Sequence, residues 1–379
     1  MGRLERYGHG GDIVTAAEIF AVNGREWIDF SSNIYPYGPP GTVVERLREC
    51  LSEPGWTALT RYPDPESRKL KHQIATFHGI DADQVLVGNG AAELIDLLLS
   101  VLGPERVGVI EPAFAEYSAA AKKRKMAVTS LITKWEKKFQ PSLEEAIQLI
   151  NQTGLVFVGI PNNPTGHSLS FSFLEEMAAA AVRSGTWLVM DEAFIDFLPD
   201  GENRSFIHQI RRFPTTIVVR SMTKFYALPG LRLGYVVAAS SVIRQLKRMQ
   251  TPWSVNSLAQ VAGCTVLDQQ VNQAFAQQVH NWLREEKAQL KADLERLTWL
   301  EVFPGEANYL LLRIQTKKAF LSASQLQEEL GKRGLLIRDC SMYQGLDERY
   351  FRIAVKTRSQ NQTLISALTE VSACLERKE

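Results

Sequence analysis

A lysine, two hydroxyl groups, an arginine and two glycines lie within fourteen positions of one another, in residues 221–234. The lysine, Lys224, comes shortly after the apolar run 216–219, so a buried strand would present its amine where water solvates it poorly. An amine in such a place can form an imine with an aldehyde, and hydroxyl and guanidinium groups can bind a phosphate. The groups in position to bind that phosphate are Ser221, Thr223 and Arg232. The segment therefore predicts an enzyme that uses pyridoxal phosphate (PLP), a phosphorylated aldehyde.

Two alternatives compete with this interpretation. A lone lysine after a strand is most often a solvated surface residue. The spacing Ser221-x-x-Lys224 is also typical of penicillin-binding enzymes, in which the serine is the nucleophile, but those enzymes also need Ser-Asp-Asn and Lys-Thr-Gly. Neither tripeptide occurs in the chain, which excludes the penicillin-binding class.

The composition is that of an ordinary globular protein. The 379 residues are 45% hydrophobic and 22% charged, enough for one large or two medium domains. The formal net charge is +1 without long blocks of one sign, so nothing favours nucleic acid or an anionic membrane as a partner. The four cysteines form no Cys-x-x-Cys pair, which argues against a zinc site or a disulfide framework. With no signal peptide and no apolar stretch long enough to span a bilayer, we expect a cytoplasmic enzyme without a metal.

The chain changes character at about residue 250. Residues 41–250 alternate apolar, strand-like runs with helix-like segments, a pattern typical of an α/β fold with a largely parallel sheet covered by helices on both faces. The residues after 250 begin with a long charged helix, and mixed strands and helices follow. We therefore expect a large PLP-binding domain over 41–250 and a smaller α+β domain built from 1–40 and 251–379.

Polar side chains follow three of the apolar runs. Asn163, Asp191 and Lys224 each come after the carboxyl end of a different predicted strand. Because ligands bind beyond the carboxyl ends of parallel strands, the three residues predict one shared site. PLP chemistry needs a protonated ring nitrogen, which a buried carboxylate maintains, and Asp191 is the candidate. Asn163 can donate a hydrogen bond to the phenolate oxygen of the ring, although its motif read alone is a turn.

A helix start and an aromatic residue complete the predicted cofactor site. Gly90 and Ala91 open a helix, and the free backbone N–H groups of its first turn suit the cofactor phosphate. Phe114 could stack on the ring, although a place in the core is the commoner role for such a residue.

Three motifs occur in order along the chain: Pro-Asn-Asn-Pro-Thr-Gly at 161–166, Asp-Glu-Ala-Phe at 191–194, and Ser-x-Thr-Lys with Gly-x-Arg-x-Gly at 221–234. With these motifs, and over nearly its whole length, the chain resembles the fold-type I PLP-dependent enzymes, in the aminotransferase branch that includes histidinol-phosphate aminotransferase. The resemblance implies that fold, PLP as the cofactor, Lys224 as the Schiff-base lysine and Asp191 as the partner of the ring nitrogen.

The same resemblance implies further contacts. Asn163 would bind the phenolate oxygen, and Arg352 would bind the substrate carboxylate. Tyr62 would reach the cofactor phosphate from the neighbouring subunit, so the active form would be a homodimer. The implied phosphate ligands within the chain are Gly90, Ala91, Ser221, Thr223 and Arg232.

One position departs from the aminotransferase pattern. Phe194 stands where many aminotransferases have a tyrosine that donates to the phenolate oxygen, so transamination should not be assumed. Further segments resemble the L-threonine-O-3-phosphate decarboxylases, which make the aminopropanol phosphate linker of cobalamin. These segments are residues 9–12, 29–34, 89–93, 191–197, 223–235, 252–256, 307–313 and 343–347.

This second resemblance implies a phosphorylated amino acid as the substrate. The reaction would convert L-threonine O-3-phosphate to (R)-1-amino-2-propanol O-2-phosphate and CO2. His9 and Arg338 would hold the substrate phosphate, while Ser32 and Asn33 would line the entrance. Three alternatives stay open: a histidinol-phosphate-type aminotransferase, a decarboxylase that prefers L-serine phosphate, and a non-catalytic PLP-binding regulator. Such regulators carry an additional DNA-binding domain, and no helix-turn-helix extension is expected here.

Overall fold

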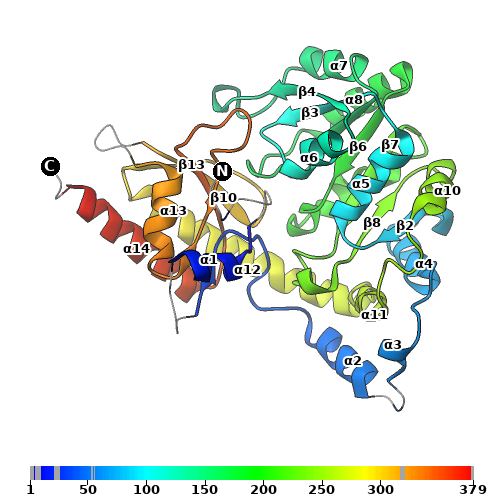
Figure 1. Ribbon diagram of the computed structural model, residues 1–379, viewed down its shortest axis with the longest axis horizontal. Coiled ribbons are helices and arrows are strands. Elements are labelled where there is room, and N and C mark those ends of the chain that lie inside the picture. Colours follow the sequence, from blue (N-terminus) through cyan, green and yellow to red (C-terminus); the bar gives the residue numbers. More distant parts are fainter. Residues whose placement is uncertain are drawn as a thin grey trace.

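A computed structural model describes residues 4, 10–20, 26–52, 54, 56–315 and 321–376, with side chains to residue 371. Two sheets and the long helix α12 (Gln269–Glu295) organise this part of the chain (Figure 1). No helix among the described residues is both long and apolar enough to cross a membrane.

The larger sheet has seven strands, in the spatial order β2-β8-β7-β6-β5-β3-β4. The five strands from β7 to β4 are parallel, whereas β8 runs antiparallel to both β2 and β7. The expected α/β fold with a mostly parallel sheet is confirmed. In spatial order the strands are β2 (Val85–Gly88), β8 (Gly234–Val237), β7 (Thr216–Ser221), β6 (Trp187–Asp191), β5 (Leu155–Gly159), β3 (Arg106–Glu111) and β4 (Ala127–Ile132).

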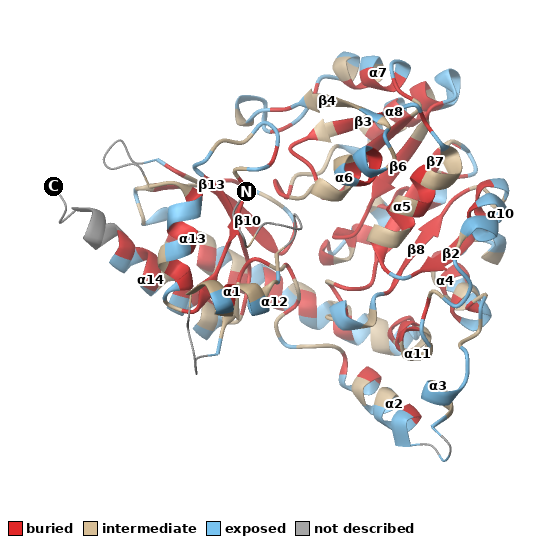
Figure 2. Ribbon diagram, viewed as in Figure 1, coloured by how far each residue is buried: buried red, intermediate tan, exposed pale blue. Residues whose placement is uncertain are grey.

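Helices cover both faces of the larger sheet, because its central strands are apolar on both sides. Neighbouring residues of β5 face opposite layers: Phe157 belongs to the apolar cluster that includes α5, and Val158 to the cluster that includes α8. Figure 2 shows the buried strands between these layers. The first layer consists of α5 (Ala91–Leu102), α6 (Ala115–Lys123) and α10 (Ser240–Met249), and the second of α7 (Leu143–Asn151) and α8 (Phe171–Ser184).

The smaller sheet has four antiparallel strands in the order β12-β13-β10-β9. They are β12 (Arg338–Asp339), β13 (Tyr350–Ala354), β10 (Tyr309–Ile314) and β9 (Leu300–Val302), and α12, α13 (Ala323–Gly331) and α14 (Arg358–Glu376) accompany them. Beside this sheet, β1 (Ile28–Asp29) pairs in parallel with β11 (Leu335–Leu336), so the first strand of the chain lies among its last ones.

The remaining helices lie around these two sheets. They are α1 (Ile13–Phe20), α2 (Gly41–Ser52), α3 (Thr57–Thr60), α4 (Arg68–His78), α9 (Gly201–Arg204) and α11 (Ser257–Val266), with 3-10 turns at Ala82–Gln84, Trp135–Lys137, Ile195–Phe197, Phe206–Gln209 and Pro229–Leu231. Helices α2 and α3 extend from the body of the molecule and are largely exposed (Figure 2).

The start of β8 approaches the start of α5 so closely that only glycine fits. A β-carbon at Gly234 would lie 2.8 Å from the carbonyl oxygen of Arg220 and 3.1 Å from the backbone nitrogen of Ala91. Because both contacts are with backbone atoms, the neighbours cannot give way by a change of rotamer.

We expect Gly234→Ala to lower the free energy of unfolding by about 1–3 kcal/mol, since a side chain there must push β8 away from β7 and α5. Gly230→Ala is the matched control, because a β-carbon at Gly230 would meet nothing within 4 Å. That control should change stability by less than about 0.5 kcal/mol. Urea denaturation of both variants measures the difference, and equal stabilities would contradict this account of the strand–helix contact.

Candidate active site

A cavity of about 380 Å³ lies where the carboxyl ends of the parallel strands face the smaller sheet. From the larger sheet and its helices it is lined by the predicted residues Ala91, Phe114, Asn163, Asp191, Ser221, Thr223, Lys224 and Arg232. From the other side come Ser32, Asn33, Arg338 and Arg352. The structure therefore brings together residues that are up to 320 positions apart in the sequence (from Ser32 to Arg352).

Lys224 follows the end of β7 and lies at the centre of this group. Its ammonium nitrogen donates to Ser221 Oγ at 3.1 Å and lies 5.8 Å from the ring centroid of Phe194. Burial lowers the pKa of Lys224 to about 8, with the charges of Arg232 and Arg352 acting in the same direction and that of Asp191 against it. A larger share of neutral amine is thus present near neutral pH, and the neutral amine is the form that attacks an aldehyde.

Asp191, the last residue of β6, lies buried at the same sheet edge. The backbone N–H of Ala193 donates to Oδ1 at 3.0 Å, and the hydroxyl of Tyr117 donates to Oδ2 at 2.7 Å. Burial raises the pKa of Asp191, while these two hydrogen bonds and the charge of Lys224 oppose that rise. A carboxylate held in this way can stabilise a cationic ring nitrogen.

A cup of hydrogen-bond donors lies at the start of α5. Gly90 precedes the helix with φ of 85°, and a β-carbon there would lie 2.6 Å from Arg232 Nη2, so the guanidinium covers the glycine backbone. On the other side, Ser221 Oγ and Thr223 Oγ1 lie 2.8 Å apart. Two hydroxyls, a guanidinium and a helix N-terminus form a donor set suited to a phosphate dianion.

The donor set and the cradle of glycines fit PLP. Substituting a larger residue at Gly90 would fill the cup, and the amine of Lys224 and the carboxylate of Asp191 provide the two groups that an aldehyde and a ring nitrogen require. Gly90, Ala91, Ser221, Thr223 and Arg232 would therefore hold the phosphate of PLP.

Asn163 lies on the loop after β5, and a residue of the smaller sheet fixes its amide. Arg352 Nη1 donates to Asn163 Oδ1, so the amide nitrogen is the group left to donate to a ligand in the cavity. Phe194 packs edge-on against Tyr309, with ring centroids 5.1 Å apart. Position 194 therefore presents a hydrocarbon wall beside Lys224 and no hydroxyl.

Two buried arginines face the cavity from adjacent strands. Arg338 of β12 is directly opposite Arg352 of β13 in the antiparallel register, and the two are 1% and 4% exposed. Arg352 also donates to the carbonyl oxygen of Ser31 at 2.6 Å, while its Nε has no hydrogen-bond partner among the described residues. Like charges at opposed positions disfavour a sheet, so this pair is suited to a ligand with anionic groups.

Three further residues are predicted to contact the substrate or the cofactor, namely Ser32, His9 and Tyr62. The Ser32 hydroxyl donates to Asp29, so it can offer only a lone pair to a ligand. His9 lies outside the described residues. Tyr62 is 80% exposed and does not line this cavity.

Two tyrosines are among the cavity residues that sequence reasoning did not assign to the site. Tyr117 of α6 donates its hydroxyl proton to Asp191 Oδ2, and no local pattern distinguishes it from a core residue. Tyr343 packs its ring against Arg338, whose guanidinium carbon lies 5.6 Å from the ring centroid. Its segment resembles the decarboxylases, but no local pattern connects it to Arg338.

Comparison with known proteins agrees with this geometry. A sequence model of the family described as aminotransferase class I and II matches residues 25–368. The chain is 37% identical over 366 residues to threonine-phosphate decarboxylase of Salmonella typhimurium, with 96% of each protein covered. It is 31% identical over 368 residues to the adenosylcobalamin biosynthesis bifunctional protein CobDQ of Leptospira interrogans, covering 96% of this chain and 41% of that protein.

Solved structures also resemble this chain in fold. The crystal structure of histidinol-phosphate aminotransferase from Clostridium acetobutylicum superposes with a TM-score of 0.83 at 29% identity, covering 91% of this chain and 99% of that one. The family match spans most of the chain and includes every described residue of the cofactor cup. The chain belongs to the class I and II aminotransferase family, whose members use PLP.

Proposed function

We propose that this protein decarboxylates L-threonine O-3-phosphate, giving (R)-1-amino-2-propanol O-2-phosphate and CO2 for the aminopropanol linker of cobalamin. The observation that carries the proposal is the pair of buried guanidinium groups, Arg338 and Arg352, on opposed positions of the cavity wall. L-Threonine phosphate has two anionic groups to match them, a carboxylate and a phosphate. Histidinol phosphate has only the phosphate, so in an aminotransferase the second arginine would serve the carboxylate of the 2-oxo acid. The similarity to a threonine-phosphate decarboxylase over almost the whole chain supports the same substrate.

The residues around Lys224 can perform this reaction. When bound, PLP supplies an aldehyde for the substrate amine and a ring that accepts the electron pair of whichever Cα bond stands perpendicular to it. Arg352 would hold the carboxylate and Arg338 the phosphate, so the substrate is fixed at both ends and its Cα–carboxylate bond takes that orientation. The Lys224 ammonium would deliver a proton to Cα in place of the CO2 that is lost. Asp191 would pair with the protonated ring nitrogen.

The direct test is incubation with L-threonine O-3-phosphate and no 2-oxo acid. We expect one CO2 and one amine product per substrate consumed, because decarboxylation needs no amino acceptor. Lys224→Ala should remove both the visible absorbance of the imine and all turnover. Amine exchange that requires a 2-oxo acid and releases no CO2 would instead establish the aminotransferase alternative.

L-Serine phosphate, which lacks one methyl group, should react with a kcat/KM about 10–200-fold lower than that of L-threonine phosphate. The reverse order of kcat/KM would identify L-serine phosphate as the preferred substrate.

The roles of Arg338 and Arg352 can be distinguished by the affinity of each variant for the product. The product keeps the phosphate and has lost the carboxylate. Arg338→Gln is expected to weaken product binding roughly 10–100-fold, the range for a lost hydrogen bond between charged groups. Arg352→Gln should leave product affinity nearly unchanged and lower kcat/KM for the substrate by a similar factor. Calorimetric titration of both variants measures this. If the two variants lose product affinity equally, the assignment of one arginine to each anion is wrong.

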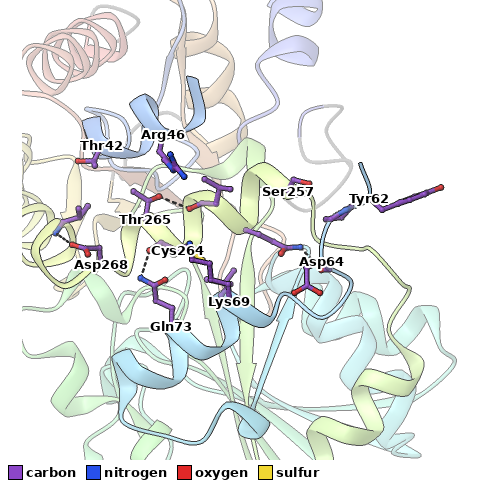
Figure 3. A pocket seen from close by; sticks show the side chains of 15 residues that line it. Thr42, Arg46, Tyr62, Asp64, Lys69, Gln73, Ser257, Cys264, Thr265 and Asp268 are labelled. Atoms are coloured by element: carbon purple, nitrogen blue, oxygen red, sulfur yellow. Dashed lines mark hydrogen bonds between the residues drawn. The ribbon is translucent and has the colours of Figure 1, made fainter. Parts of the chain in front are cut away.

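We also propose that the active form is a homodimer whose second copy covers the face around α2 and α3. A groove of about 650 Å³ lies on this face, between α2, α4 and α11 (Figure 3). Large apolar side chains are exposed beside it, among them Trp56 and Leu59 at 60% each. Tyr62 lines the edge of this groove (Figure 3) and packs its ring against Trp253, with centroids 4.8 Å apart. It remains 80% exposed, so it is accessible to a neighbouring subunit. Exposed apolar patches of this kind mark protein interfaces.

Light scattering should therefore give about twice the 42.5 kDa mass of the chain. Leu59→Glu is expected to dissociate the dimer, because it places a charge on the exposed apolar face around α2 and α3. Val182→Glu is the control: Val182 is also exposed, at 41%, but lies on α8 and should leave the dimer intact. A wild-type protein of monomer mass that retains full activity would contradict the shared-site proposal.

Two coarser assignments accompany the function. We propose the domain division into 41–250 and 1–40 with 251–379, supported by the larger sheet lying within 85–237 and the smaller one within 300–354. We propose a cytoplasmic location, supported by free cysteines at Cys50, Cys264 and Cys340.

A further inference from the structure

Tyr117 is buried beside the carboxylate that faces the ring nitrogen, and the proposed mechanism gives it no part. It lies on α6, is 2% exposed, and donates its hydroxyl proton to Asp191 Oδ2 at 2.7 Å. Burial raises the pKa of Tyr117 well above its ordinary value, and the neighbouring charge of Asp191 adds to the rise. The hydroxyl therefore keeps its proton and acts as a donor.

The surroundings hold the ring of Tyr117 in one place. It stacks on Phe157 with centroids 4.7 Å apart and an angle of 2° between the rings, and it meets Phe114 edge-on at 5.6 Å. Gly159 is opposite Asp191 in the sheet, and a β-carbon there would be in ordinary van der Waals contact with the hydroxyl, at 3.6 Å. The tyrosine thus reaches Asp191 without freedom to turn away.

A buried carboxylate needs such donors to stay charged. Taking Asp191 out of water favours its neutral form, and each hydrogen bond to the charged form opposes this. The groups that face Asp191 are Tyr117 from α6, the backbone of Ala193, Lys224 after β7 and, less directly, Tyr309 of β10. When the Lys224 amine is neutral, its charge no longer assists, and Tyr117 is then the one side-chain donor to Asp191 among the described residues.

We propose that Tyr117 is a positioning residue for the cofactor: its hydroxyl keeps the Asp191 carboxylate ionised and in one orientation, ready to pair with a protonated ring nitrogen. The inference rests on the proposed PLP-dependent function. It also explains why a ring-stacking residue and a carboxylate donor occur one helical turn apart, as Phe114 and Tyr117.

The test is Tyr117→Phe in the full-length chain, since this change removes one oxygen and keeps the ring. Infrared spectra of the PLP-free protein across a pH series report protonation of Asp191, identified by the band that Asp191→Asn abolishes. We expect the midpoint of this band to move to higher pH in Tyr117→Phe. Tyr226→Phe is the matched control, because it removes a buried hydroxyl that accepts from Asn272, away from Asp191, and should leave the midpoint in place.

The affinity for PLP provides a second measurement, by fluorescence titration. Tyr117→Phe should weaken PLP binding roughly tenfold or more, and the effect should vanish when Asp191→Asn is already present, because the two residues act as a unit. An unchanged infrared midpoint, or an equal loss of affinity in both backgrounds, would overturn the proposal by assigning Tyr117 to packing alone. If the wild-type chain fails to bind PLP through Lys224, the proposed function is wrong, which is a separate outcome.

Discussion

The site depends on placing two groups of opposite charge, Lys224 and Asp191, in one poorly solvated cavity. Burial alone would neutralise both, since it lowers the pKa of the amine and raises that of the carboxyl. Each charge opposes that effect on the other, so neither group can be considered by itself. The pair exists because β6 and β7 are parallel neighbours whose carboxyl ends lie at the same edge. The sheet therefore determines the electrostatics of the site before any ligand enters.

The smaller sheet contributes to the cofactor side of the cavity as well as to the substrate side. Arg352 binds the amide of Asn163, and the hydroxyl of Tyr309 donates to the carbonyl oxygen of Asn162 at 2.7 Å. Nearby, Arg204 and Glu306 form a paired ion bridge with distances of 2.8 and 3.0 Å between the two parts of the chain. The loop after β5 is thus held by two strands of the smaller sheet. A shift of the smaller sheet would move Asn163 together with the substrate-binding arginines.

The sequence predicts those site residues whose positions depend on local chemistry. Lys224, Asp191 and Asn163 are found without a structure because each lies at or shortly after the end of an apolar strand, and the carboxyl ends of parallel strands lie at one edge of the sheet. The opposition of Arg338 and Arg352 depends on strand register between residues fourteen positions apart, which no local pattern encodes. Tyr117 was missed because its helix is rich in alanine and its partner lies 74 positions away. Nothing local distinguishes such a tyrosine from a core residue.

The parallel pair of β1 and β11 has a consequence for synthesis on the ribosome. The larger sheet is complete once residue 237 has emerged, so the cofactor cup and Lys224 can assemble early. Ile28, in contrast, cannot form its strand pair until Leu335 has been synthesised. The segment with Ser32 cannot take its final place before then. We therefore expect the phosphate cup to be able to form during synthesis before the substrate side is complete.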